Sequence, residues 1–139
     1  MRTDASMLAI EAGAAPRELR VLVVEDEVLT RLMLADELRC QGLQVLEASN
    51  AHEALTVLQS ALPVHLLFTD IRMPGEMDGV ALAKFAHAHF PQIKSIIGSS
   101  GRPEQPTDDF ADAFLAKPYD LRAMVDQVRR LLSESGYEH

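Results

Sequence analysis

The sequence predicts an α/β domain built on a five-stranded parallel sheet with helices on both faces. Three features predict this fold class: short apolar runs recur five times, most are followed by apolar residues at helical spacing, and polar residues, glycine or proline separate the units. Strands that alternate with helices favour parallel pairing through right-handed crossovers. A chain of 139 residues is long enough for one hydrophobic core, so we expect a single domain.

The first half of the chain contains two strand–helix units. Residues 20–24 carry four apolar residues in series, which is typical of a strand covered on both faces. Residues 28–41 have helical spacing and should end at Gly42, a good C-terminal cap. Residues 44–48 form the second predicted strand. The helix that follows begins at Ser49 or Asn50, is stopped by Pro63, and has an apolar stripe of Ala51, Ala54, Leu55, Leu58 and Leu62.

The second half supplies three more strands. The third, residues 65–69, leads directly into Asp70, and a Pro/Gly turn separates it from a helix at about 80–89. The fourth strand, 93–99, is interrupted by polar residues and glycine, and the fifth covers 113–116. The last helix has Asp120 as its cap and a buried stripe of Leu121, Met124, Val125, Val128 and Leu132.

Two prolines, Pro103 and Pro106, lie between the fourth and fifth strands. Proline removes a backbone donor and clashes with the preceding helical turn. We therefore predict that the fourth helix is short or irregular, from about Thr107 to Phe110.

Charged and hydroxyl residues follow the predicted strands. Ligands of open parallel sheets bind beyond the carboxyl ends of the strands, and the residues found there are Glu25, Asp26, Asp70, Ser99, Ser100 and Lys117. Three converging carboxylates would repel one another unless a cation shares the site. Carboxylate oxygens favour Mg²⁺, which leaves room for phosphate oxygens, and Lys117 adds a second positive charge.

At this point the chain resembles the response-regulator receiver family (CheY-like) of two-component signal transduction. The motifs that carry the resemblance are Val-Leu-Val-Val-Glu-Asp-Glu at 21–27, Leu-Leu-Phe-Thr-Asp-Ile-Arg-Met-Pro at 66–74, Met-Asp-Gly at 77–79, Ser-Ser-Gly at 99–101 and Phe-Leu-Ala-Lys-Pro-Tyr at 114–119. The resemblance covers nearly all of the chain. It implies a (βα)5 doubly wound, flavodoxin-like sheet of strand order 2-1-3-4-5.

The resemblance also implies roles for the strand-end residues. Asp70 would be the phosphoacceptor that takes a phosphoryl group from a kinase phosphohistidine. Mg²⁺, for which Mn²⁺ could substitute, would be held by Asp26, Asp70, the main-chain carbonyl of Arg72, and Glu25 through water. Lys117 would bind the phosphoryl oxygens.

Two further roles follow from the resemblance, each with an alternative. Ser100 matches the hydroxyl residue that donates to the phosphoryl group, and Ser99 is the alternative. Phe114 matches a switch aromatic; otherwise it is a core residue of an edge strand.

The implied organisation is an N-terminal extension at 1–18, flexible or a short helix, a receiver domain at 19–135 and a tail at 136–139. The implied partners are a histidine kinase or histidine phosphotransfer protein, a downstream protein target, and a second copy of the chain in a homodimer. The domain would promote only its own phosphorylation and dephosphorylation and would not be a turnover enzyme.

Composition limits the remaining possibilities. A net charge of −8 and scattered basic residues argue against direct nucleic-acid binding, and no apolar run is long enough to span a membrane. One cysteine and an N-terminus without a long apolar stretch favour the cytoplasm.

Three other functions compete with the receiver interpretation, and the residues present argue against each. An aspartyl-phosphate phosphatase would have a second aspartate where Arg72 stands, and a flavin module would need a Ser/Thr/Gly-rich loop where Glu25 and Asp26 stand. A phosphorylation-independent interaction domain would not need every acidic, hydroxyl and lysine position to be filled.

Overall fold

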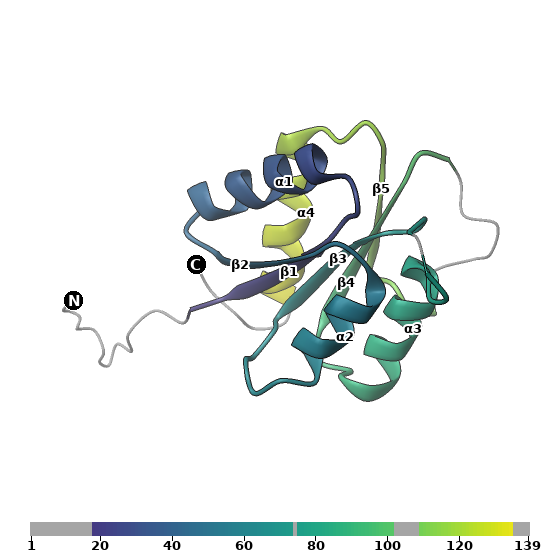
Figure 1. The fold of residues 1–139 in the computed structure, drawn as a ribbon. Coiled ribbons are helices and arrows are strands. Elements are labelled where there is room, and N and C mark those ends of the chain that lie inside the picture. The colour runs from purple at the N-terminus through teal and green to yellow at the C-terminus, as the bar shows by residue number, and fades with distance from the viewer. Residues whose placement is uncertain (1–17, 74, 102–108, 135–139) are drawn as a thin grey trace, which may run out of the picture.

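The computed structural model describes residues 18–73, 75–101 and 109–134. Its five strands are all parallel and lie in the order β2-β1-β3-β4-β5 (Figure 1), which confirms the predicted fold class. The strands are β1 (Arg20–Val24), β2 (Gln44–Ala48), β3 (Leu66–Asp70), β4 (Lys94–Ser99) and β5 (Ala113–Ala116). The helices in this part of the chain are α1 (Val28–Cys40), α2 (Ala51–Leu58), α3 (Gly79–His89) and α4 (Leu121–Glu134).

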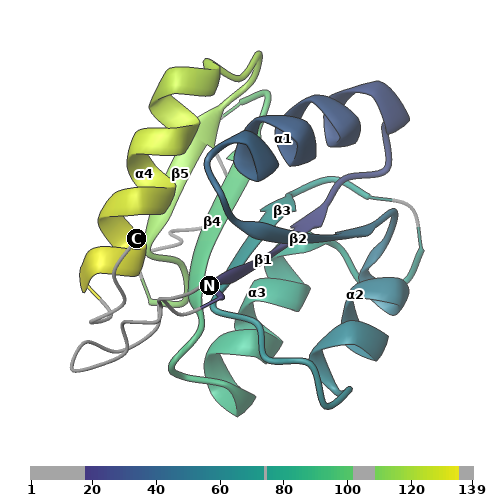
Figure 2. The same ribbon diagram turned by 90° about the vertical axis from the view of Figure 1, so that its left-hand side faces the viewer.

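Helices cover both faces of the sheet. Helices α1 and α4 pack on one face, and α2 and α3 pack on the other (Figures 1 and 2). Alternate residues of each strand point to opposite faces. Val21 and Val23 therefore belong to the core beneath α1 and α4, whereas Leu22 and Val24 belong to the core beneath α2 and α3.

The helix ends follow the local capping signals. Gly42 has φ +88°, which suits the chain reversal after α1. Asn50, one of the two predicted caps of α2, accepts a hydrogen bond from the Glu53 amide, and Glu53 in turn accepts one from the Ser49 amide. Asp78 and Asp120 cap α3 and α4, and each accepts a hydrogen bond from the amide of the third residue of its helix.

Several predicted boundaries differ from the structure, most of them by one residue. Helix α2 ends at Leu58, so Leu62 lies beyond it and is 48% exposed rather than part of its apolar stripe. Asp70 is the last residue of β3 itself, and α3 begins at Gly79.

Within the described residues, no helix is long and apolar enough to cross a bilayer. Residues 107 and 108 of the predicted helix at 107–110 lie outside the described residues, as do residues 1–17 of the predicted extension and the tail, whereas Asp109 and Phe110 form a turn.

Candidate functional site

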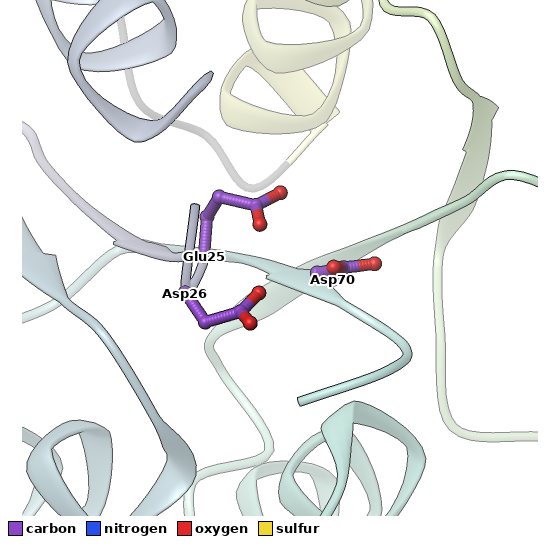
Figure 3. A group of neighbouring side chains, drawn as sticks. All are labelled: Glu25, Asp26 and Asp70. Carbon is purple, nitrogen blue, oxygen red and sulfur yellow. The ribbon is translucent and has the colours of Figure 1, made fainter. Parts of the chain in front are cut away.

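Three carboxylates meet at the carboxyl edge of β1 and β3. These strands are neighbours, with Val24 opposite Thr69, so the residues that follow them lie side by side. One oxygen from each of Glu25, Asp26 and Asp70 lies within 4.8 Å of the others (Figure 3). Glu25 and Asp70 are 1% and 5% exposed, while Asp26 is open to solvent. The site therefore has a buried side and an open side.

Lys117 brings a positive charge to this cluster from the end of β5. Its Nζ lies 3.0 Å from Asp70 Oδ2, to which it donates a hydrogen bond, and 3.1 Å from Glu25 Oε1, with which it forms an ion pair. The Lys117 amide also donates to the Ser99 carbonyl at 2.8 Å. The lysine that the sequence placed at the fifth strand end thus contacts two of the three carboxylates directly.

Burial and neighbouring charges shift the pKa values of buried Glu25 and half-buried Lys117. Burial raises the pKa of Glu25, although the Glu27 amide and Lys117 partly counter it; Asp70 raises it further. Partial burial alone would lower the pKa of Lys117, but the neighbouring carboxylates of Asp70 and Glu25 raise it overall. The charged lysine is therefore strongly favoured in the folded protein.

The donor set suits a hard divalent cation. Three carboxylates against one ammonium leave two negative charges when all are ionised. Glu25 Oε1 is buried and faces Lys117 Nζ at 3.1 Å, and a carboxylate oxygen with one such partner still has a lone pair for a water or a cation. Asp26 is exposed, which leaves space for metal-bound water. The residues present therefore fit Mg²⁺.

The two candidate serines occupy different environments. Ser99 is the last residue of β4, is 3% exposed and lies opposite Ala116, one residue before Lys117. Its Oγ accepts a hydrogen bond from the Gly101 amide. Ser100 lies beyond the strand and is exposed. Ser99, the alternative candidate, is thus buried at the strand end, whereas Ser100, the first candidate, is exposed beyond it.

Arg72 and Phe114 lie at the margins of the site. Arg72 is exposed in the loop after β3, two residues beyond Asp70. Phe114 lies on β5 opposite Ile97 and is 36% exposed. This exposure contradicts the interpretation of Phe114 as a core residue.

Two glycines, Gly79 and Gly98, allow the close packing around the site. A Cβ at Gly79 would lie 1.8 Å from the Asp70 carbonyl oxygen, so only glycine lets α3 begin against the end of β3. A Cβ at Gly98 would lie 1.9 Å from the Tyr119 hydroxyl, which fills the space over β4. The Met-Asp-Gly motif was the sequence signal for Gly79; Gly98 had none.

Tyr119 closes the site from the side of α4. Its ring meets Phe68 edge to face, with 5.3 Å between centroids. Burial, together with the charges of Asp70 and Glu25, raises the pKa of the phenol far above its usual value. Its hydroxyl is buried and has no partner within the described residues. The phenol therefore stays neutral beside the acidic cluster.

The acidic cluster and its lysine lie at the carboxyl edge of a 2-1-3-4-5 sheet, where doubly wound α/β domains bind their ligands. The response regulator receiver domain family model matches residues 21–129, so the chain belongs to this family. Receiver domains of two-component systems bind Mg²⁺ at an acidic pocket, and response regulators interact with histidine kinases and downstream effectors.

Individual relatives agree with this assignment. The chain is 34% identical over 130 residues to a probable transcriptional regulatory protein of Picosynechococcus, covering 85% of this chain and 51% of that protein. It is 27% identical to the sporulation initiation phosphotransferase F of Bacillus subtilis, with 81% and 93% covered. The chain spans about half the length of the first relatives that it matches.

Solved structures give the same result. A CheY-like receiver domain protein of Methanospirillum hungatei superposes with a TM-score of 0.79 at 26% identity, over 86% of this chain and 98% of that one. The response regulator TrrA of Thermotoga maritima, in complex with Mg²⁺ and BeF, superposes with a TM-score of 0.74 at 27% identity, with 82% and 99% covered.

Proposed function

We propose that this domain accepts a phosphoryl group on Asp70 from a protein phosphohistidine and then presents an altered surface to a downstream protein. The observation that carries the proposal is the contact of Lys117 with Asp70 inside a three-carboxylate cluster. A buried carboxylate that already has a cationic partner can meet an incoming phosphoryl group without building up unbalanced charge. Mg²⁺ held by Asp26, Asp70, the Arg72 carbonyl and, through water, Glu25 would neutralise phosphoryl oxygens when bound.

In the transfer step, an Asp70 carboxylate oxygen attacks phosphorus. A new O–P bond forms as the P–N bond to the donor histidine breaks, and the imidazole nitrogen keeps the electron pair of the broken bond. Lys117 moves its interaction from the aspartate to the phosphoryl oxygens. Ser99, buried at the end of β4, is the hydroxyl that we favour as the donor to the phosphoryl group.

The geometry argues against a turnover enzyme. A phosphatase that forms an aspartyl phosphate would use an acid two residues after its nucleophile, and an exposed arginine, Arg72, stands there. Arginine cannot donate a proton to a leaving group at physiological pH. The domain would therefore catalyse only its own phosphorylation and dephosphorylation.

The direct test is to incubate the protein with acetyl phosphate and Mg²⁺ and to measure its intact mass. We expect the addition of one phosphoryl group, which is lost when EDTA is present and absent in Asp70→Asn. Equal labelling of Asp70→Asn would refute the assignment. Ser99→Ala should change the rate of labelling or its persistence much more than Ser100→Ala does.

The start of α1 offers a docking surface for the protein that carries the phosphohistidine. Four apolar side chains on this helix are exposed, namely Val28 at 53%, Leu29 at 79%, Leu32 at 40% and Met33 at 41%. Their spacing places them on adjoining turns of one helix, which begins two residues after Asp26. A donor helix laid against this apolar surface would bring its histidine toward the carboxylates.

Labelling by a phosphorylated protein requires docking and chemistry, whereas labelling by acetyl phosphate requires the chemistry alone. Comparing the two therefore isolates the effect of docking. Leu29→Ser should slow labelling by a histidine-phosphorylated phosphotransfer protein that labels the wild type, and should leave labelling by acetyl phosphate unchanged. Leu62→Ser is the matched control, because Leu62 is also exposed but follows the end of α2. Equal effects of the two substitutions on protein-to-protein transfer would refute this docking surface.

A further inference from the structure

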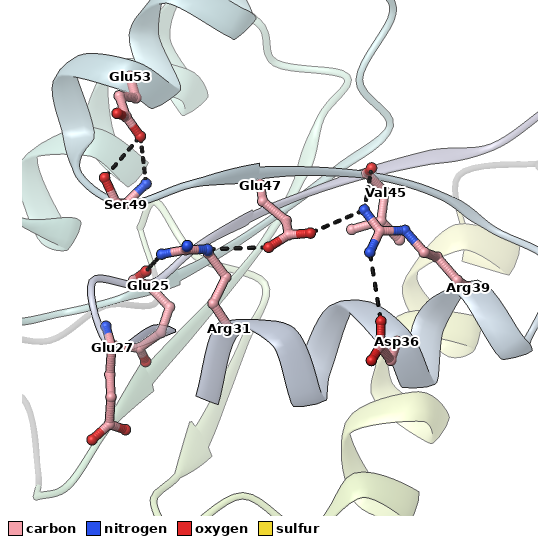
Figure 4. A network of polar contacts seen from close by, with 9 residues as sticks. All are labelled: Glu25, Glu27, Arg31, Asp36, Arg39, Val45, Glu47, Ser49 and Glu53. Carbon is pink, nitrogen blue, oxygen red and sulfur yellow. Dashed lines mark hydrogen bonds and ion pairs between the residues drawn. The ribbon is translucent and has the colours of Figure 1, made fainter. Parts of the chain in front are cut away.

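An arginine on α1 is joined to the backbone of the acidic cluster. Arg31 lies one turn into α1, with a side chain that is 16% exposed. Its guanidinium donates to the Glu25 carbonyl oxygen at 2.9 Å and to Glu47 on β2 at 3.1 Å (Figure 4). The other Glu47 carboxylate oxygen accepts from Arg39 at 3.1 Å. Arg31 therefore bridges a fixed anion on the sheet and the loop that carries Asp26.

The Glu25 peptide groups are fixed from two sides. The Glu25 amide donates to the Ala48 carbonyl at 3.0 Å, as a continuation of the pairing of β1 with β2. The Glu25 carbonyl, held by Arg31, belongs to the same planar peptide unit as the Asp26 amide. Fixing that carbonyl fixes the plane from which Asp26 extends. Asp26 is itself exposed, so its own side chain is not held by burial.

We infer that Arg31 is a positioning residue for the cation site, one that sets the direction of Asp26 through the Glu25 carbonyl. The inference rests on the proposed function, in which Glu25, Asp26 and Asp70 hold Mg²⁺. Arg31 donates two hydrogen bonds in different directions, which a planar guanidinium can do and a single ammonium cannot do equally well. Arg31 itself is not a ligand.

Charge and positioning predict opposite effects when Arg31 is replaced. A cation beside an acidic cluster repels a second cation, so removing its charge should strengthen Mg²⁺ binding if only the charge matters. If the hydrogen bond to the Glu25 carbonyl positions Asp26, removing it should weaken Mg²⁺ binding. The sign of the change in Mg²⁺ affinity thus separates the two explanations.

The test measures Mg²⁺ affinity by calorimetry for the wild type, Arg31→Gln, Arg31→Lys and Arg39→Gln. We expect about a tenfold loss of affinity in Arg31→Gln, the size usual for groups that orient metal ligands. Arg31→Lys should also lose affinity although it keeps the charge. Arg39→Gln is the matched control, because Arg39 pairs with the same Glu47 carboxylate but does not contact Glu25.

A second measurement needs no metal. Amide hydrogen exchange at Asp26 and Glu27 in the metal-free protein should be faster in Arg31→Gln than in the wild type and unchanged in Arg39→Gln. Unchanged or tighter Mg²⁺ binding by Arg31→Gln, or an equal loss in Arg39→Gln, would overturn the inference. A wild type that binds no Mg²⁺ would instead refute the proposed function. The exchange data would then still show whether Arg31 holds the backbone at Asp26.

Discussion

Replacing Gly79 with alanine should destabilise the domain, although alanine is the better helix former. Helix propensity alone predicts a gain of up to about 1 kcal/mol in the free energy of unfolding. However, the new Cβ would lie 1.8 Å from the Asp70 carbonyl oxygen and 2.9 Å from Ile71 Cα, which are both backbone atoms. To regain ordinary contact, the start of α3 must move away by about 1.5 Å.

The movement has an energetic cost that can be bounded. Overpacking against rigid neighbours costs about 1–3 kcal/mol. The Gly79 amide also donates to the Ile71 carbonyl at 2.9 Å, and losing such a bond costs about 1 kcal/mol. After the gain in helix propensity is subtracted from these two costs, we expect a net loss of about 2 kcal/mol in the free energy of unfolding.

Urea unfolding followed by far-ultraviolet circular dichroism measures this loss. The chain has no tryptophan, so the helical signal is the practical probe. The midpoint should fall while the m-value stays constant. Gly101→Ala is the control, because a Cβ there meets no atom within 4 Å. A Gly79→Ala protein as stable as the wild type would show that the close approach of α3 to β3 is not obligatory.

Three further predictions concern the site. Millimolar Mg²⁺ should raise the melting temperature, EDTA should reverse the rise, and Asp26→Asn should abolish it; a rise that survives in Asp26→Asn would place the cation elsewhere. Because the folded-state pKa of Lys117 is raised, the lysine stabilises the fold fully below its ordinary pKa of 10.5 and loses this effect as the pH rises through the higher folded value. The stability gap between the wild type and Lys117→Met should therefore narrow above about pH 10.5 in urea titrations, and a constant gap would contradict this. Tyr119→Phe removes a buried hydroxyl that has no partner among the described residues, so thermal melting should show equal or slightly higher stability. A loss above about 1 kcal/mol would mean that the hydroxyl is bonded in solution.

The sequence was sufficient to predict the inner strands because β1, β3 and β4 are buried on both faces, which favours apolar residues in series. The predicted segments 20–24, 44–48 and 113–116 coincide with β1, β2 and β5, although β2 and β5 are less buried edge strands. The error at Leu62 has a local cause. The Ser60 hydroxyl donates to the Val57 carbonyl and accepts from the Leu62 amide, and this short-range bonding ends the helix early.

The sequence could predict a site residue only where its residue type and its position at the end of a strand were sufficient. Carboxylates and a lysine at strand ends indicate their shared edge, and Glu25, Asp26, Asp70 and Lys117 do lie together. Our preference for Ser99 over Ser100 depends on where β4 ends and on its register against β5, because a shift of one residue changes the side on which a side chain lies.

Contacts that depend on how a helix packs against the sheet were beyond prediction. The approach of Gly79 to Asp70 depends on how closely α3 packs against the sheet. The reach of Arg31 to the Glu25 carbonyl depends on the rotation of α1 over β2. Neither is encoded in a spacing of residue types along the chain.

The phosphoacceptor candidate stands at the end of the most enclosed strand of the sheet. Every residue of β3 is buried, whereas residues of β5 alternate between half-buried and exposed. A covalent change at Asp70 would thus occur in the part of the sheet that is least able to move. Any structural adjustment should therefore take place at the edge strand β5. We expect slow amide exchange along β3 whether or not Asp70 is modified, and the changes that a partner senses should concentrate around β5.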